Sequence, residues 1–294
     1  MSPQEECERF KEALRPLFKA FIAFCEEHQL TWFCAYGTTL GVVRHHGFIP
    51  WDDDIDVFMP REDYDRFLAL KGTLKDSEYE ILDWEDKGYY LHFAKFCDRK
   101  TTLIEKEGER SLGIYIDVFQ LDYYNPQYSR LLQRYNQLYR YMWLTYAHGV
   151  RRHSWRAFAQ SVRQGKVGRT GLIVADATIF RLLAWPAKII IRRFNRYLVN
   201  TPKSDKLWHY DIIDAYSNII CEKDWFAESL KMPFEDFEVM MPKGYKEFLT
   251  QRYGDYMQLP PEDKRISHHN HYFVDFGNRQ NTKPSTLNHI DGSR

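Results

Sequence analysis

The first 122 residues alternate between helical and extended hydrophobic patterns. From Glu5 to Glu27 apolar residues recur every three or four positions, which predicts an amphipathic helix packed on a sheet. Similar spacing predicts helices over Thr38–His45 and Glu62–Leu70. Short β-branched or aromatic runs, bounded by Gly, Asp or Lys, predict strands at Thr31–Ala35, Ile55–Met59, Tyr79–Trp84, Leu91–Cys97 and Ile114–Leu121. The expected fold class is α/β (α+β), with a mixed sheet flanked by helices.

From Tyr128 to Leu198 the pattern is helical throughout. Turn signals inside this stretch predict about three helices, and Pro186 predicts that the last one is kinked or split. Farther on, Phe234–Met241 has the pattern of a strand, and Pro242–Tyr253 has that of a helix that stops at Gly254. The helical stretch is therefore inserted between the predicted sheet and the C-terminal part of the chain.

These patterns divide the chain into four segments. They are a core over residues 1–122, a helical insert over 123–204, a C-terminal part over 205–276 and a tail over 277–294. The tail is polar and poor in core-forming residues, so we expect it to be frayed.

Charge is distributed unevenly along the chain. Overall, 41 Lys and Arg balance 41 Asp and Glu, and the insert carries no recognised nucleic-acid motif, so we expect no nucleic-acid partner. Between Tyr128 and Lys203, however, fifteen Lys and Arg accompany a single acid, Asp176, which leaves that stretch near +14 and the remainder near −14. Cations interleaved with Trp, Tyr, Leu and Ile are typical of a helix on anionic lipid, and a solvated helical face is the alternative. We expect residues 128–203 to bind an anionic membrane surface.

Cysteine usage and hydropathy set further limits. The five cysteines are odd in number and widely spaced, which argues against a disulfide framework or a zinc knuckle and favours a reducing compartment. The acidic N-terminus lacks the pattern of a signal peptide. The longest apolar stretch, Leu172–Ile191, contains Asp176, Arg181 and Lys188, so we expect no transmembrane segment. The expected location is cytoplasmic, peripheral on the inner face of the cytoplasmic membrane.

Three aspartates carry the clearest chemical signal. If Asp54–Phe58 is a strand, alternation puts Asp54 and Asp56 on one face, and the same alternation in a neighbouring strand makes Asp117 available as a third acid. Carboxylates that share one spot repel each other unless a divalent cation lies between them. We therefore predict that these three residues bind Mg²⁺ (or Mn²⁺), with Asp117 acting as a ligand or as a general base.

Candidate phosphate-binding residues lie on either side of these acids. Gly37, Thr38 and Thr39 fall between a predicted strand and a predicted helix, where backbone N–H groups can hold a phosphate. Lys95 and Arg99 lie on or just after another strand and can hold a diphosphate, or they form a solvated strand end. Both groups are candidates for binding a phosphorylated substrate.

Several motifs resemble those of the LicD family, which comprises bacterial phosphorylcholine transferases and includes the animal fukutin-related protein. The longest is AYGTTLGVVRHHGFIPWDDDIDVFMPREDYDRF, and the others, in the same order as in the family, are FAKFCDRKTTLIE, GIYIDVFQLD and YGDYMQLPPEDKRISHH. The resemblance implies a nucleotidyltransferase-like core and transfer of a phospho-alcohol from CDP-choline or a related CDP-alcohol. The implied acceptor is a glycan hydroxyl, with a lipid-linked glycan expected, and CMP is the implied leaving group.

The resemblance also implies roles for individual residues. Asp54 and Asp56 correspond to metal ligands, Asp117 to a third acid, and Gly37 with Thr38 to a phosphate-binding turn.

Near the C-terminus, the resemblance implies that Arg265, His268 and His269 contact the donor or the acceptor, so residues 205–276 are expected to complete the active site. Adjacent histidines point in different directions, which makes a zinc site there the weaker interpretation.

The sequence does not determine which alcohol is transferred with the phosphate. An aromatic box can hold the quaternary ammonium of choline, and the candidates, which can equally be core residues, are Trp51, Trp84, Tyr89, Tyr90 and Tyr115. Ribitol phosphate and glycerol phosphate are alternative transferred groups.

Two other function classes are a nucleotidyltransferase that acts on nucleic acid and a non-catalytic membrane adaptor. The adaptor alone predicts that replacing Asp54 and Asp56 by Asn leaves function untouched.

Overall fold

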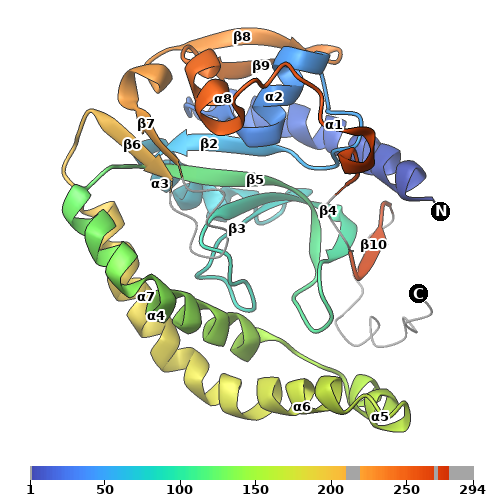
Figure 1. The fold of residues 1–294 in the computed structure, drawn as a ribbon. Helices are drawn as coiled ribbons and strands as arrows, with labels where there is room; N and C mark the ends of the chain where they lie inside the picture. The colour runs from blue at the N-terminus through green and yellow to red at the C-terminus, as the bar shows by residue number, and fades with distance from the viewer. Residues whose placement is uncertain (1, 210–218, 268–270, 278–294) are drawn as a thin grey trace.

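A mixed β-sheet forms the centre of the molecule (Figure 1). The structure is a computed structural model and describes residues 2–209, 219–267 and 271–277. The main path of the sheet runs β1-β2-β5-β4-β10, while β3 pairs with β4, and β6 and β7 continue from β5. Its strands are β1 (Phe33–Cys34), β2 (Asp56–Pro60), β3 (Tyr79–Leu82), β4 (Ala94–Ile104), β5 (Leu112–Tyr123), β6 (Lys206–His209), β7 (Ile219–Glu222) and β10 (Phe273–Asp275). Among the described pairs, β2 and β5 are parallel and the others are antiparallel.

Helices flank this sheet, which confirms the predicted α/β (α+β) class. The α-helices are α1 (Pro3–Glu27), α2 (Tyr36–His45), α3 (Arg61–Ala69), α4 (Pro126–Val150), α5 (Trp155–Arg163), α6 (Val167–Ala175), α7 (Arg181–Val199) and α8 (Tyr245–Tyr253). A π-helical turn (Asp176–Phe180) joins α6 to α7. Short 3₁₀ turns cover Leu70–Leu74, Lys223–Phe226 and Glu262–Lys264.

Alternate side chains of the central strands point to opposite faces of the sheet and pack in two hydrophobic cores, one on each face. On one face, Val57 of β2 and Val118 of β5 pack with the buried stripe of α1, which includes Phe18 and Phe21. On the opposite face, Phe58 and its neighbours pack with residues from α2 and α8. The long N-terminal helix is therefore a structural support for the strands, as its periodicity predicts.

The insert forms a separate helical layer. Helices α4 and α7 pack side by side around a small core that contains Trp143, Ala187 and Ile191, and α5 and α6 lie at the far end of this layer (Figure 1). It also touches the body of the protein, because Trp84 lies 6.1 Å from Trp143 between ring centroids. None of the described helices has the length and apolar composition needed to span a bilayer.

Three details differ from the sequence-based expectations. Phe234–Met241 is not one strand, because Glu235 has a positive φ of 56° and turns the chain between β8 (Ser229–Phe234) and β9 (Phe237–Pro242). Of the two expectations for Pro186, a kink or a split, the split is wrong: α7 runs through Pro186 as one helix, with Ala187 and Ile191 buried against α4. The third is that β6, β7 and β10 add strands that the sequence pattern did not predict. Residues 278–294, where a frayed tail is expected, lie outside the described residues.

Candidate active site

Two of the predicted acids lie side by side in the sheet. The parallel pairing of β2 with β5 sets Asp56 directly beside Asp117. The N–H of Asp56 donates a hydrogen bond of 2.8 Å to Oγ1 of Thr38, which fixes the start of β2 against α2. Burial, followed by the charges of Asp54, Asp117 and Asp52, raises the pKa of Asp56 well above its ordinary value. Four carboxylates therefore act on one another at the beginning of β2.

A buried lysine partly compensates this negative charge. Lys95 of β4 pairs in register with Asp117, and its Nζ lies 2.7 Å from Oδ1 of Asp117 and 3.5 Å from Oε1 of Glu105. Its side chain is only 1% exposed, and Nζ also lies 3.2 Å from the ring centroid of Tyr115. The interpretation of Lys95 as part of a solvated strand end is therefore wrong.

Burial and charge act in opposite directions at this pair. Burial lowers the pKa of Lys95, but Asp117 and Glu105 outweigh it and leave that pKa above its ordinary value. Burial raises the pKa of Asp117 to about 6, against the opposing effect of Lys95. The lysine thus stays charged and holds Asp117 in place.

The glycine-containing turn lies next to the acids. Helix α2 starts at Tyr36, which has a positive φ of 37°, and no side chain caps its N-terminus. A Cβ at Gly37 would lie 2.7 Å from Oδ2 of Asp52, so this carboxylate approaches the first turn of the helix. A small cavity is lined here by Gly37, Thr38, Gly47, Phe48, Ile49, Asp52, Asp54 and Phe234. Thr39, in contrast, is completely buried.

Arg99 makes structural contacts away from these acids. Its guanidinium donates to the carbonyl oxygens of Leu74, Lys75 and Ser77 at 3.2, 2.9 and 3.1 Å. These bonds hold the connection between α3 and β3. The structure therefore brings Lys95, but not Arg99, to the acidic cluster.

The C-terminal part of the chain closes over the same region. Ser267 donates a 3.0 Å hydrogen bond to the carboxylate of Asp53, and the guanidinium of Arg265 lies 5.7 Å from the ring centroid of Trp51. Arg44 of α2 also approaches Trp51 and donates to the carbonyl oxygens of Tyr256 and Gln258. His268 and His269 lie outside the described residues.

Tyr253 and Glu105 are members of this neighbourhood that the sequence reasoning did not single out. Burial raises the pKa of Tyr253 to about 12, and the charges of Asp56 and Asp52 contribute to the shift. Glu105 accepts a 2.8 Å hydrogen bond from the hydroxyl of Tyr115 and lies beside Lys95. Glu105 ends the motif FAKFCDRKTTLIE and Tyr253 begins YGDYMQLPPEDKRISHH, so their place in these motifs was the signal that could have identified them.

The donor set suits a magnesium ion that is shared with substrate. Among the described residues, no three His, Cys, Asp or Glu side chains are arranged to hold a metal ion by themselves. Mg²⁺ commonly takes one or two protein carboxylates and completes its octahedron with water and substrate phosphates. The adjacent, mutually repelling carboxylates of Asp56 and Asp117 fit that mode of binding.

Three of the five aromatic candidates, Trp84, Tyr89 and Tyr115, pack in one small hydrophobic cluster, and Trp51 and Tyr90 belong to other clusters. Trp84 packs on the insert, Tyr115 lies beside Lys95, and Trp51 lies beside Arg44 and Arg265. The hydroxyl of Tyr89 donates to a backbone carbonyl oxygen, and that of Tyr90 to Glu109.

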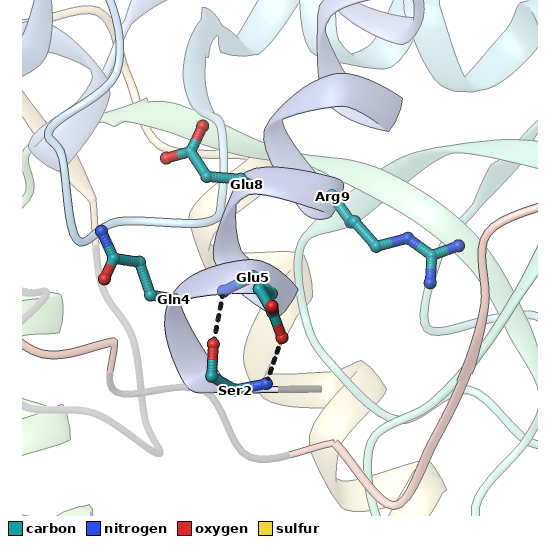
Figure 2. A pocket seen from close by; sticks show the side chains of 5 residues that line it. All are labelled: Ser2, Gln4, Glu5, Glu8 and Arg9. Atoms are coloured by element: carbon teal, nitrogen blue, oxygen red, sulfur yellow. Dashed lines mark hydrogen bonds between the residues drawn. The ribbon is translucent and has the colours of Figure 1, made fainter.

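A second hollow lies at the start of α1 (Figure 2). It is lined by Ser2, Gln4, Glu5, Glu8 and Arg9. Ser2 and Glu5 are already engaged with each other in a capping box, with hydrogen bonds of 2.7 and 3.2 Å. Because its polar groups serve the helix terminus, we place no chemistry there.

Comparison with known proteins supports one family. Residues 29–162 match the LicD/FKTN/FKRP nucleotidyltransferase domain, a region that contains the acidic cluster. The lipopolysaccharide cholinephosphotransferase LicD of Haemophilus influenzae is 29% identical over 252 residues, which cover 85% of this chain and 90% of that protein. An uncharacterized protein of Rickettsia typhi is 27% identical over 123 residues, covering 42% of this chain and 38% of that protein. These similarities support the LicD family as the family that this chain resembles.

Proposed function

We propose that this protein is a transferase that moves phosphocholine from CDP-choline to a hydroxyl of a cell-surface glycan or its lipid-linked precursor, with release of CMP. The observation that carries the proposal is the half-buried pair of Asp56 and Asp117, set in register by parallel strands beside the buried Lys95. The name of the Haemophilus influenzae relative supports choline phosphate as the transferred group and lipopolysaccharide as the type of acceptor.

The reaction requires charge neutralisation more than covalent catalysis. The acceptor hydroxyl forms a new bond to the phosphorus that bears the choline, the bond from that phosphorus to CMP breaks, and the hydroxyl proton passes to a base. In our assignment Asp56 and Asp117, together with phosphate oxygens of the donor, would hold Mg²⁺ (or Mn²⁺), with the charge of Asp54 close by, and the ion would neutralise the diphosphate oxygens. Asp117 is the candidate base if it is not itself a ligand.

The chain's own residues give these acids their positions. Lys95 orients Asp117 through the 2.7 Å contact, and Thr38 fixes the backbone of Asp56. The first turn of α2 at Gly37 lines the cavity beside them, where phosphate oxygens can meet backbone N–H groups. The carboxylate of Asp52 already lies close to this turn, so a phosphate that binds there has to displace it. Because Asp52 and the phosphate are both negative, we expect phosphate binding to depend on a cation that offsets their repulsion.

The proposed place of reaction is the cytoplasmic face of the membrane. A lipid-linked acceptor is presented at a bilayer surface, and the basic insert, residues 128–203, is the part of the chain suited to it.

The decisive experiment measures CMP release from CDP-choline, CDP-ribitol and CDP-glycerol, each with Mg²⁺ or EDTA and with an acceptor extract. We expect metal-dependent release from CDP-choline by the wild type and loss of nearly all turnover in Asp54→Asn and Asp56→Asn. Asp76→Asn, which changes an exposed carboxylate elsewhere, is the matched control.

Preference for CDP-ribitol or CDP-glycerol would replace choline as the transferred group. Silence with all three donors from a folded protein, or full activity in the two Asn variants, would contradict the proposal and favour another donor or a non-catalytic adaptor.

A further inference from the structure

The linked helices α6 and α7 expose an unusually apolar surface. Leu182 and Trp185 are 79% and 75% exposed, although residues of these types are usually buried or half-buried. The surface, called here the outer face, is formed by Leu172, Val174, Ile179, Leu182, Leu183, Trp185, Ile189 and Ile190. So many exposed large apolar side chains on two linked helices indicate a binding surface.

Helix α7 is apolar on two sides. Ala187 and Ile191 are buried against α4, and their positions alternate along the helix with exposed ones such as Leu182 and Ile189. A helix with one packed side normally presents a polar surface to water. The outer face therefore lacks a partner among the described residues, whereas the inner side has one.

The ion pairs of the insert separate its cations in the same way. Arg151 pairs with Glu109, Arg169 with Glu107, and Lys188 with Glu85, at 2.9, 2.5 and 3.6 Å. Acids of the protein's body thus neutralise these three cations, and Glu85 and Glu62 pair in the same way with the more exposed Arg192 and Lys203.

Other cations stay on the surface of the insert. Arg163, Lys166, Arg181 and Arg193 are exposed, and none of them forms an ion pair with a described acid. An apolar stripe accompanied by unneutralised cations is complementary to an anionic bilayer.

The shape of the molecule agrees with this choice of partner. The layer of α6 and α7 lies on the side opposite β8 and β9, so a flat surface can reach it without touching the sheet (Figure 1). With about +14 in residues 128–203 and about −14 elsewhere, an anionic surface attracts this side and repels the rest.

We infer that the outer face of α6 and α7 inserts into the headgroup region of anionic lipid, with Leu182 and Trp185 as apolar anchors and Arg181 and Arg193 on the phosphates. The inference rests on the proposed function only for its purpose, which is to bring the site to a lipid-linked acceptor. Lipid binding itself requires no turnover.

The test is flotation of the full chain with vesicles of phosphatidylcholine alone or mixed with phosphatidylglycerol. We expect binding only to the mixed vesicles, weakened roughly tenfold or more in the double variant Leu182→Ser, Trp185→Ser. Removing charge in Arg181→Gln and Arg193→Gln should weaken it about fivefold per residue. The matched control is Leu138→Ser with Tyr141→Ser, which replaces two exposed apolar residues on α4 of the same insert.

Equal binding to both vesicle types, or an equal loss in the α4 control, would overturn the assignment. So would a solution dimer, detected by light scattering, that Leu182→Ser dissociates, because the partner would then be a second copy of the chain. CMP release in detergent separates the two proposals. Release without flotation refutes only the lipid surface, and flotation without release refutes only the proposed reaction.

Discussion

At the scale of single residues, the carboxylates of the acidic cluster repel one another in the folded protein. Asp56 is raised in pKa by burial and by Asp54, Asp117 and Asp52, so its negative charge is disfavoured in the metal-free protein. Asp56→Asn removes this charge and should raise the free energy of unfolding by about 1 kcal/mol in EDTA. CMP release should fall roughly a thousandfold in the same variant. Chemical denaturation and the donor assay measure the two effects, and a variant that is both less stable and fully active would contradict this account.

The opposite charge at Lys95 predicts a different result. Lys95→Met leaves the half-buried carboxylates of Asp117 and Glu105 without their cation, so the free energy of unfolding should fall by about 2 kcal/mol. Lys100→Met is the control, because that lysine is 61% exposed and pairs only with Glu78 at the surface, and it should change stability little. Urea denaturation of both variants tests the comparison. A similar small effect in both would mean that Lys95 is not the counter-ion of the cluster.

Alternation along the strands identified the acids of the site, but not how they meet. The sequence pattern puts Asp56 and Asp117 on strands, whereas their parallel pairing is a long-range property that no local pattern specifies. Lys95 was singled out as a cation that could hold a diphosphate, whereas its pairing with Asp117 depends on the register of β4 and was not predicted. The structure does not bring Arg99 to the acidic cluster. A charged residue near a strand end does not reveal from sequence that its guanidinium binds backbone carbonyl oxygens instead.

At the scale of elements, the long N-terminal helix was predictable from its periodicity, whereas short strands were predicted in some places and missed in others. Helix α1 was anticipated because one face buries many apolar residues, and strands β2 and β5 because their β-branched and aromatic runs are buried on both faces. Strands β6, β7 and β10, of three or four residues each, were missed, although β3, also of four residues, was predicted. The turn at Glu235 was missed because it lacks the glycine or asparagine that usually adopts a positive φ.

Packing within the insert depends on one close contact between elements. A Cβ at Gly149 of α4 would lie 2.3 Å from the carbonyl oxygen of Phe180 in the π-helical turn. Gly149→Ala should therefore destabilise the insert by about 2 kcal/mol. Gly171→Ala in α6 meets nothing within 4 Å and should stabilise it by about 0.5–1 kcal/mol through helix propensity. Hydrogen exchange of the insert amides measures both, and effects of the same sign would refute the close contact.

At the scale of the whole molecule, the thiols report whether the fold is intact. All five cysteines are free and buried, and burial raises the pKa of Cys221 to about 12. Because the thiolate is the reactive form, a disulfide reagent should label the native protein very slowly and the urea-unfolded protein at all five positions. Rapid labelling of a thiol in the native protein would show that part of the core opens readily.

The insert leaves and rejoins the sheet at neighbouring positions. Tyr123 at the end of β5 pairs with Leu207 of β6, so the long helical excursion is a loop closed by a hairpin stem. The entropy of closing a loop grows only logarithmically, by about 0.6 kcal/mol for each doubling of its length. The β5–β6 junction can therefore gain or lose helices at small cost while Asp117, farther back on β5, keeps its place. One catalytic scaffold can in this way carry interchangeable attachments that decide the surface on which it works.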